Sequence, residues 1–225
     1  MNSFSIILYD SARARSYIQH LCENGLFPNE VLLMPGCWEP PANLRRSKKI
    51  SFDFKEPVQE TISKYRLKIV SCKTQDINNE NTIENIKKRS SDQFIIFGGA
   101  GGQILKKPVL SQGVPILHIH PGIVPNYRGS TTIYYSMLVE GKAGCSAFFF
   151  NEKIDDGPLV LRKTYKLIRG INIDYMFDPE IRGLMLVEAV KKLTLSMRTT
   201  IVKKKTLPYF IIHPVLKHIA MLKNT

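Results

Sequence analysis

The stretch from Phe94 to Gly122 reads FIIFGGAGGQILKKPVLSQGVPILHIHPG and contains two short apolar runs, which a glycine-rich turn and a lysine-bearing segment separate. Glycine ends the first run, and glycine and proline flank the second, which is typical of strands buried inside a sheet. Pro121 and Gly122 end the second run. His118 and His120 alternate just before this end, so we expect both at the carboxyl end of a strand and on one face of it.

Short apolar runs alternate with helical patterns along most of the chain. The runs that predict strands cover residues 4–9, 31–34, 67–70, 94–97, 114–119, 145–150 and 159–167. The patterns that predict helices cover residues 10–25, 56–63, 131–139 and 173–197. Such alternation indicates β-α-β units, so we predict a Rossmann-like α/β fold with a mostly parallel sheet and helices on both faces. Binding sites in such sheets form beyond the carboxyl ends of the strands.

The predicted elements fit one large unit with a short appendage. With 225 residues and 44% hydrophobic content, the chain can bury a sizeable core. We assign residues 1–200 to an α/β catalytic domain and residues 201–225 to a C-terminal tail that packs on this domain or on a partner subunit. The polar segment 74–91 is helical at most, and residues 208–216 indicate a strand or turn followed by a short helix.

Composition limits the class of protein. The net charge of +13 implies attraction to anions, such as nucleic acid, an acidic membrane surface or a phosphorylated small substrate. The four cysteines lack the spacing of a zinc ribbon, a redox pair or a disulfide framework, which favours reduced thiols. The N-terminus lacks a signal-peptide pattern, and no apolar run approaches the length of a membrane span. We therefore predict a cytoplasmic protein without a membrane span.

The glycine-rich turn Gly98–Gly102 invites comparison with nucleotide-binding loops. A dinucleotide fingerprint is expected after the first strand and with an acidic residue about twenty positions later. This turn instead lies in mid-chain and leads to Lys106 and Lys107. The favoured interpretation is a sharp turn whose backbone approaches a flat ligand or a neighbouring strand without obstruction from a Cβ atom.

Two histidines and one aspartate are the candidates for chemistry. An unperturbed imidazole titrates near neutral pH, so a histidine at the mouth of the sheet can exchange protons. Asp155, which precedes a turn-like sequence, can orient such a ring, favour its charged form and relay a proton through water. A metal held by His118 and His120 is an alternative interpretation, but only Asp155 is available to complete the set, and we expect no metal.

These residues carry a resemblance to the formyltransferase family, which includes the glycinamide ribonucleotide and methionyl-tRNA formyltransferases and the nucleotide-sugar N-formyltransferases. That family has an Asn-x-His-Pro-Ser-Leu-Leu-Pro-x-Tyr-Arg-Gly segment, followed by a catalytic aspartate in an Asp-x-Gly-Pro-like turn. Residues 120–129 read HPGIVPNYRG and residues 155–158 read DDGP, which match the two segments at the expected separation. One departure stands at the centre of the match, because His118 replaces the family's asparagine.

The resemblance implies N10-formyltetrahydrofolate as formyl donor and a primary amine as acceptor. It assigns His120 as the main hydrogen-bond donor to the developing oxyanion, Asp155 as its proton partner, and His118 as a weaker substitute for the asparagine. The positions that match the family's pterin-binding segments are Gly102, Gln103, Ile104, Leu105, Phe150, Asn151, Lys153 and Ile154. The positions that match its formyl and acceptor loop are Asn126, Tyr127, Arg128, Gly129 and Ser130.

The favoured acceptor is a small phosphorylated molecule, most of all a nucleotide-linked amino sugar, which scattered lysines and arginines would attract. No pattern of a C-terminal RNA-binding domain is seen, so we expect no stable nucleic-acid partner, whereas a homodimer is compatible with the sequence. A purine-pathway glycinamide ribonucleotide formyltransferase is a second interpretation, although residues 9–13 lack the Gly-x-Gly-Ser stretch of those enzymes. A non-catalytic folate- or sugar-binding member of the family and an RNA-binding protein are further alternatives.

Overall fold

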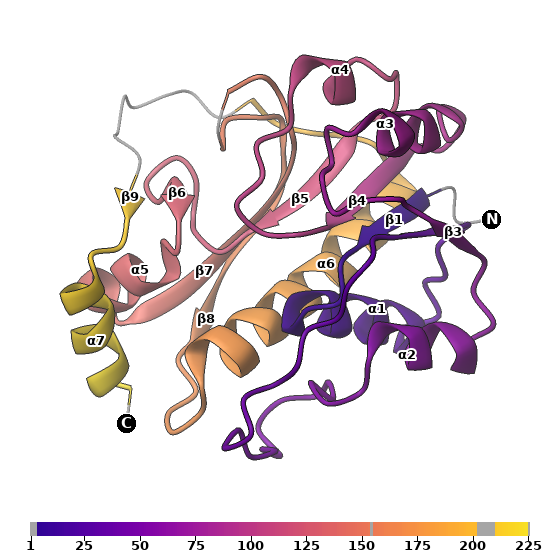
Figure 1. The fold of residues 1–225 in the computed structure, drawn as a ribbon. Helices are drawn as coiled ribbons and strands as arrows, with labels where there is room; N and C mark the ends of the chain where they lie inside the picture. Colours follow the sequence, from indigo (N-terminus) through magenta and orange to yellow (C-terminus); the bar gives the residue numbers. More distant parts are fainter. Residues whose placement is uncertain (1–3, 154, 202–209, 225) are drawn as a thin grey trace.

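A sheet of seven strands forms the centre of the molecule, and the computed structural model describes residues 4–153, 155–201 and 210–224. The strands are β1 (Phe4–Leu8), β2 (Val31–Leu33), β3 (Ile69–Ser71), β4 (Phe94–Gly98), β5 (Ile116–His120), β7 (Lys142–Phe149) and β8 (Leu159–Lys166). Their order in the sheet is β3-β2-β1-β4-β5-β7-β8 (Figure 1). The strands from β3 to β5 are parallel, whereas β7 and β8 are antiparallel to their neighbours. The predicted α/β fold with a mostly parallel sheet is confirmed.

Helices cover both faces of this sheet, as the sequence predicts. They are α1 (Ala12–Glu23), α2 (Val58–Lys64), α3 (Glu80–Lys87), α4 (Lys107–Leu110), α5 (Ile133–Glu140), α6 (Asp178–Leu195) and α7 (Pro214–Leu222). Helices α1, α2 and α6 lie on one face, and α3 and α4 lie on the other (Figure 1). In β1, Ile6 packs in the core that α1 and α6 share, whereas Ile7 packs with Ile86 of α3 and Val109 of α4. Burial on both faces explains why this strand is a continuous apolar run.

The first helix lies within the predicted range 10–25, and Ser11 and Gly25 mark its two ends. Ser11 accepts a hydrogen bond from the backbone N–H of Ala14 at 3.2 Å, and α1 begins at the next residue. Gly25 follows the end of the helix with a φ of 69°, which lies in the left-handed region that favours glycine. The carboxyl end of β1 is thereby joined to a helix whose N-terminus faces the same edge of the sheet as the ends of β4 and β5.

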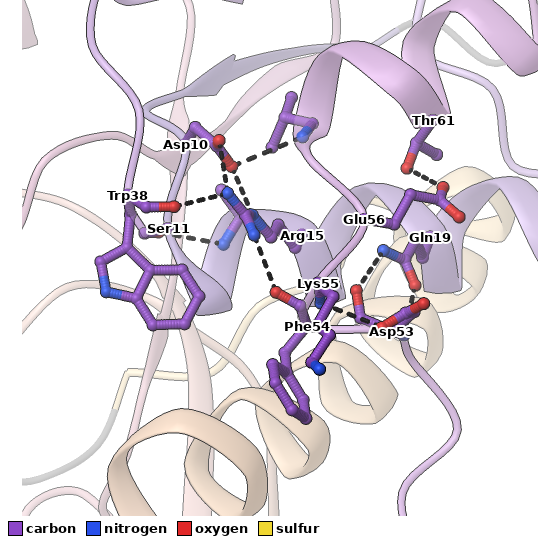
Figure 2. Close-up of polar contacts among 12 residues, drawn as sticks. Asp10, Ser11, Arg15, Gln19, Trp38, Asp53, Phe54, Lys55, Glu56 and Thr61 are labelled. Atoms are coloured by element: carbon purple, nitrogen blue, oxygen red, sulfur yellow. Dashed lines mark hydrogen bonds and ion pairs between the residues drawn. The ribbon is translucent and has the colours of Figure 1, made fainter. Parts of the chain in front are cut away.

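A buried arginine fastens the long connection between β2 and α2 to α1 (Figure 2). Two nitrogens of Arg15 each lie 2.7 Å from a carboxylate oxygen of Asp10. The same guanidinium donates to the carbonyl oxygens of Phe54 at 2.8 Å and of Trp38 at 2.6 Å. Although Arg15 is only 2% exposed, its charge is paired and its donors are used. The long connection between β2 and α2 therefore has a fixed path.

Two predicted helices are shorter in the structure. Within segment 74–91 only α3 is helical, because the side chain of Asn79 caps it by accepting from Asn81 N at 3.0 Å. The helix predicted over 173–197 begins as a π-helical turn, Ile173–Phe177, before α6 starts. Pro179, in the first turn of α6, has no N–H to donate, so one continuous α-helix is interrupted there.

The described part of the C-terminal tail packs beside the segment that follows β5. Two short strands, β6 (Gly129–Ser130) and β9 (Phe210–Ile211), pair in parallel, and α7 lies against α5 (Figure 1). Lys217 of α7 forms an ion pair with Asp174 at 2.6 Å. Residues 208 and 209 of the predicted strand or turn lie outside the described residues, and the short helix after it is present as α7. Within the described ranges, no helix combines the length and the apolar character that crossing a membrane requires.

Candidate active site

A cavity of about 590 Å³ opens at the carboxyl ends of β4 and β5. One wall is the glycine-rich turn after β4, and another consists of His118, His120 and Asp155. Ser130, which pairs with the C-terminal strand β9, closes a further side. The cavity therefore lies where the topology of a parallel sheet places ligand sites, and it contains all three residues that the sequence singles out for chemistry.

The ring of His120 is held in one orientation by the main chain. Its Nε2 atom lies 2.7 Å from the carbonyl oxygen of Tyr127 and 3.3 Å from the hydroxyl of Thr132. A carbonyl oxygen can only accept, so Nε2 carries a proton, and Nδ1 is the free position that faces Asp155. Burial lowers the pKa of His120 below its usual value, and the carboxylate of Asp155 opposes this effect.

Asp155 contacts the other segment of the sequence motif, residues 120–129, through both of its carboxylate oxygens. Its Oδ1 atom lies 3.7 Å from Nδ1 of His120, and its Oδ2 accepts a hydrogen bond from Gly129 N at 2.7 Å. Asp155 has a φ of 50°, a left-handed conformation that aspartate tolerates better than most residues. A Cβ atom at Gly157 would lie 1.6 Å from the carbonyl oxygen of Phe149, so the turn can press against β7 only with glycine there.

His118 lies between aromatic rings. Its ring stacks on Phe150 at 4.6 Å and meets the edge of Phe148 at 5.5 Å. Its Nδ1 atom is buried and has no hydrogen-bond partner among the described residues. Burial, together with the charges of Arg182 and of other neighbours, lowers the pKa of His118 well below its usual value. This imidazole is therefore neutral at physiological pH and has one nitrogen that a ligand could satisfy.

Charged residues from distant parts of the chain form the remaining wall, and sequence reasoning missed them. Arg182 of α6 pairs with Asp178 at 3.3 Å and donates to the carbonyl oxygen of Ile119 at 2.7 Å. Arg13 of α1 donates to the carbonyl oxygen of Gly99, and burial together with the charge of Arg182 lowers its pKa to about 10. Arg182 follows Asp178 at helical spacing, which alone indicates an ordinary surface ion pair, so no local signal could place the pair beside β5.

Nine further predicted positions line the cavity, whereas others do not. Those lining it are Gly102, Gln103, Ile104, Leu105, Gly129, Ser130, Phe150, Asn151 and Lys153. Asn126 is exposed and Arg128 is buried, and neither belongs to the described lining. Tyr127 contributes its carbonyl oxygen to His120, while its hydroxyl donates to Glu140 at 2.7 Å. Ile154 lies outside the described residues.

The polar segment before α3 supports the glycine-rich wall. Gln103 accepts from Ile77 N at 2.7 Å and donates to the carbonyl oxygen of Gln75 at 2.6 Å. Asn78 donates to the carbonyl oxygen of Ile104 at 3.0 Å and accepts from Lys106 N at 2.8 Å. The side chain of Gln103 is thus used to position its loop, which leaves mainly backbone and apolar groups on this wall for a ligand.

Comparison with known proteins connects this cavity to one family. A family model described as "Formyl transferase" matches residues 40–176. The chain is 30% identical over 156 residues to the methionyl-tRNA formyltransferase of Thermosipho melanesiensis, covering 68% of this chain and 46% of that protein. It is also 30% identical over 125 residues to the Pelagibacter ubique enzyme of the same name, covering 54% of this chain and 38% of that protein. The chain spans less than half the length of these curated relatives.

Solved structures share the fold at low identity. Glycinamide ribonucleotide transformylase 1 from Symbiobacterium toebii superposes with a TM-score of 0.61 at 15% identity, covering 90% of this chain and 95% of that one. A sugar N-formyltransferase from a Shewanella species superposes with a TM-score of 0.57 at 16% identity, covering 100% of this chain and 88% of that one. At such identities the likeness concerns the architecture of the chain.

Proposed function

Since the chain belongs to the formyl transferase family, we propose that it transfers a formyl group from N10-formyltetrahydrofolate to a primary amine of a small anionic acceptor. The observation that carries this proposal is the pairing of His120 with Asp155 at 3.7 Å on the wall of a cavity of about 590 Å³. The two residues belong to separate segments of the family motif, and the fold brings them together.

The glycine-rich wall has the character that a flat heterocycle requires. Phe97, Leu105 and Phe150 supply apolar surface to the cavity, and the backbone of Gly101 and Gly102 is open on its Cβ side. Apolar walls with a few backbone donors and acceptors suit a planar, hydrogen-bonding ring. These residues would hold the pterin of the folate, and His118 and His120 would face the formyl group.

When bound, the folate supplies a formyl carbon to amine attack, and negative charge then grows on the formyl oxygen. His120 can donate to that oxygen from Nδ1 only after taking up a proton there, because its Nε2–H is used by Tyr127. Asp155 favours this protonated ring and is placed to receive a proton from the attacking amine through water. Neutral His118 can donate one further hydrogen bond, and such a donor stabilises a transition state by roughly 3–4 kcal/mol.

Two arginines support an acceptor that carries a phosphate or another anion. Arg13 and Arg182 both line the cavity, and the Nε atom of each is buried without a partner among the described residues. Arg182 pairs with the carboxylate of Asp178 at 3.3 Å, whereas Arg13 forms no ion pair among the residues that the structure describes. An anionic group near Arg13 would compensate its buried charge. A nucleotide-linked amino sugar has both the amine and the anionic group, and glycinamide ribonucleotide has them too.

The curated relatives favour a second acceptor, because both are methionyl-tRNA formyltransferases by name. The amino group of methionyl-tRNA therefore belongs in the test. The purified full chain is incubated with N10-formyltetrahydrofolate and, in separate reactions, with nucleotide-linked amino sugars, glycinamide ribonucleotide or methionyl-tRNA. Mass spectrometry then follows the gain of one formyl group.

We expect formylation of one small anionic acceptor, its loss in the Asp155→Asn variant, and a raised KM for that acceptor in Arg13→Gln. Folate binding by calorimetry without formylation of any acceptor would instead support a non-catalytic binding protein. Exclusive formylation of methionyl-tRNA would overturn the small-acceptor assignment while keeping formyl transfer.

A further inference from the structure

We propose that His118, His120 and Asp155 form a binding site for one zinc ion. Each of the three side chains offers one ligand atom, and these atoms all lie within 4.8 Å of one another. The sequence leaves only Asp155 to complete the set and therefore suggests no metal, but the fold brings Asp155 to the two histidines. Two imidazoles and one carboxylate, with an open position toward a cavity, are a ligand set that zinc uses in catalytic sites.

The hydrogen bond on the far side of His120 supports this assignment. Histidines that bind metals commonly donate their other N–H to a backbone carbonyl or a carboxylate, which fixes the tautomer. Nε2 of His120 lies 2.7 Å from the carbonyl oxygen of Tyr127, so the lone pair of Nδ1 is directed toward the cavity. Nδ1 lies 3.7 Å from Oδ1 of Asp155. A tetrahedral zinc ion with bonds of about 2.0–2.2 Å separates its ligand atoms by roughly 3.5 Å, so this pair already has nearly the required spacing.

His118 supplies the ligand that the family's asparagine would not. Its Nδ1 atom is buried without a partner among the described residues, in contrast to most buried polar atoms of folded proteins. The ligand atoms of the three residues lie within 4.8 Å of one another, whereas tetrahedral zinc separates its ligand atoms by roughly 3.5 Å, so a bound ion would draw the His118 ring closer. The replacement of asparagine by histidine therefore changes the chemistry of the cavity as well as its shape.

The charges around the three residues set the expected affinity. Arg13 and Arg182 also line this cavity and oppose a dication, whereas Asp178, which pairs with Arg182 at 3.3 Å, favours it. Asp155 adds one negative charge as a ligand. The ion would occupy Nδ1 of His120, the atom that needs a proton in the proposed formyl transfer, so the two uses of the site exclude each other. The zinc site itself does not rest on the proposed function, because metal binding is measured without folate or acceptor.

The test uses the full chain after treatment with a chelator and removal of that chelator. Co²⁺ is added as a probe, since a four-coordinate site gives it intense visible absorption, and Zn²⁺ and Mg²⁺ are added as competitors. We expect one Co²⁺ per chain, displacement by Zn²⁺, and no displacement by Mg²⁺, which prefers oxygen ligands. The melting temperature of the wild-type protein should rise with Zn²⁺ concentration, because the ion binds the folded state.

Variants then assign the site. His118→Asn and Asp155→Asn should each weaken Co²⁺ affinity by more than roughly tenfold, the lower limit for removing even an outer-shell partner. His218→Asn is the matched control, because His218 is exposed on α7, and it should bind Co²⁺ as the wild type does. Circular dichroism verifies that each variant is folded. If His118→Asn does not fold, Asp155→Asn alone provides the test. Wild-type protein that fails to bind Co²⁺ stoichiometrically, or folded variants that bind as well as the control, would overturn the proposal.

Discussion

Nδ1 of His120 lies 3.7 Å from Oδ1 of Asp155, and both side chains are buried in the wall of one cavity. Gly129 N, 2.7 Å from the other carboxylate oxygen, fixes the aspartate, and the carbonyl oxygen of Tyr127 fixes the imidazole. The relative position of the imidazole and the carboxylate is therefore determined by main-chain contacts. Rigid main-chain support of this kind is what proton transfer in a preorganised site requires.

Replacing Asp155 by asparagine should lower kcat for formyl transfer by about 10²–10³. The amide keeps the shape of the side chain and can still accept from Gly129 N, but it cannot favour a protonated His120 or take up a proton. His120→Ala should lose a similar factor, because it removes the donor itself. The rate is measured as formylated acceptor in single-turnover reactions. Asp156→Asn, at the next position along the turn, is the matched control, and an equal loss there would contradict a specific role for Asp155.

The His118→Asn variant should retain or gain formyl transfer. An asparagine amide donates hydrogen bonds at any pH and restores the family pattern, whereas a neutral imidazole donates only one. His118→Phe keeps an aromatic ring beside Phe150 but removes the donor, so kcat should fall. Both variants are compared with the wild type under saturating donor and acceptor. Equal rates for Asn and Phe would show that no hydrogen bond from this position is used.

The centre of the fold could be predicted because β1 and β4 are buried along their whole length, which makes them mainly apolar. The end of a helix pattern is harder to read: the amphipathic stretch from residue 173 continues through the π-helical turn, and only Pro179 indicates the break. The path of the connection between β2 and α2 could not be predicted, because Arg15 sets it through carbonyl oxygens of Trp38 and Phe54. Because every residue type has a main-chain carbonyl oxygen, the residue types at these positions do not indicate such contacts.

The location of the cavity could be predicted where its residues lie in recognisable motif segments. His120 and Asp155 lie in two such segments, and the fold places both on the wall of one cavity, 3.7 Å apart. Arg13 and Arg182 could not be found, because α1 and α6 bring them together from opposite ends of the chain. Tyr127 shows the opposite case: the family resemblance assigns it to the formyl and acceptor loop, but its carbonyl oxygen is the group that contacts His120.

The contribution of the buried pair of His20 and Glu180 to the free energy of unfolding should depend on pH. Burial alone would lower the pKa of His20, but the carboxylate of Glu180, 3.7 Å from Nε2, together with the backbone of Ser16 and the charge of Glu23, outweighs burial and raises it. A raised folded-state pKa stabilises the fold fully below the unfolded value of about 6.5, and this contribution is lost as pH rises through the folded pKa. The difference in unfolding free energy between wild type and His20→Gln should therefore be larger at about pH 6 than at about pH 9. Urea titrations at the two pH values measure it, and a difference that grows with pH would contradict the ion pair.

Gly157 should tolerate no side chain. Its added Cβ would lie 1.6 Å from the carbonyl oxygen of Phe149, a main-chain atom that cannot move without disturbing β7. Gly157→Ala should therefore cost roughly 1–3 kcal/mol of unfolding free energy and displace the Asp155 turn. Gly101→Ala is the matched control, since its Cβ would have no atom within 4 Å, and its cost should stay within about 0.5 kcal/mol. Chemical denaturation compares them, and similar stabilities would show that the turn can shift freely.

Removing Arg15 should cost far more stability than removing an exposed charged residue. Arg15→Met leaves Asp10, which is fully buried, without its partner, and breaking a buried ion pair on one side costs roughly 3–5 kcal/mol. Lys163→Met removes one partner of the exposed pair with Glu188 and should cost about 1 kcal/mol or less. In the double variant Arg15→Met with Asp10→Asn, part of the stability should return, because no charge is left buried. If Arg15→Met were as stable as Lys163→Met, the buried charge would not be the cause. The same would follow if the double variant lost the summed stability of Arg15→Met and Asp10→Asn.

Limited proteolysis adds a second readout. Arg15→Met should be cleaved faster between residues 36 and 57, since the contacts to Trp38 and Phe54 are lost with the guanidinium.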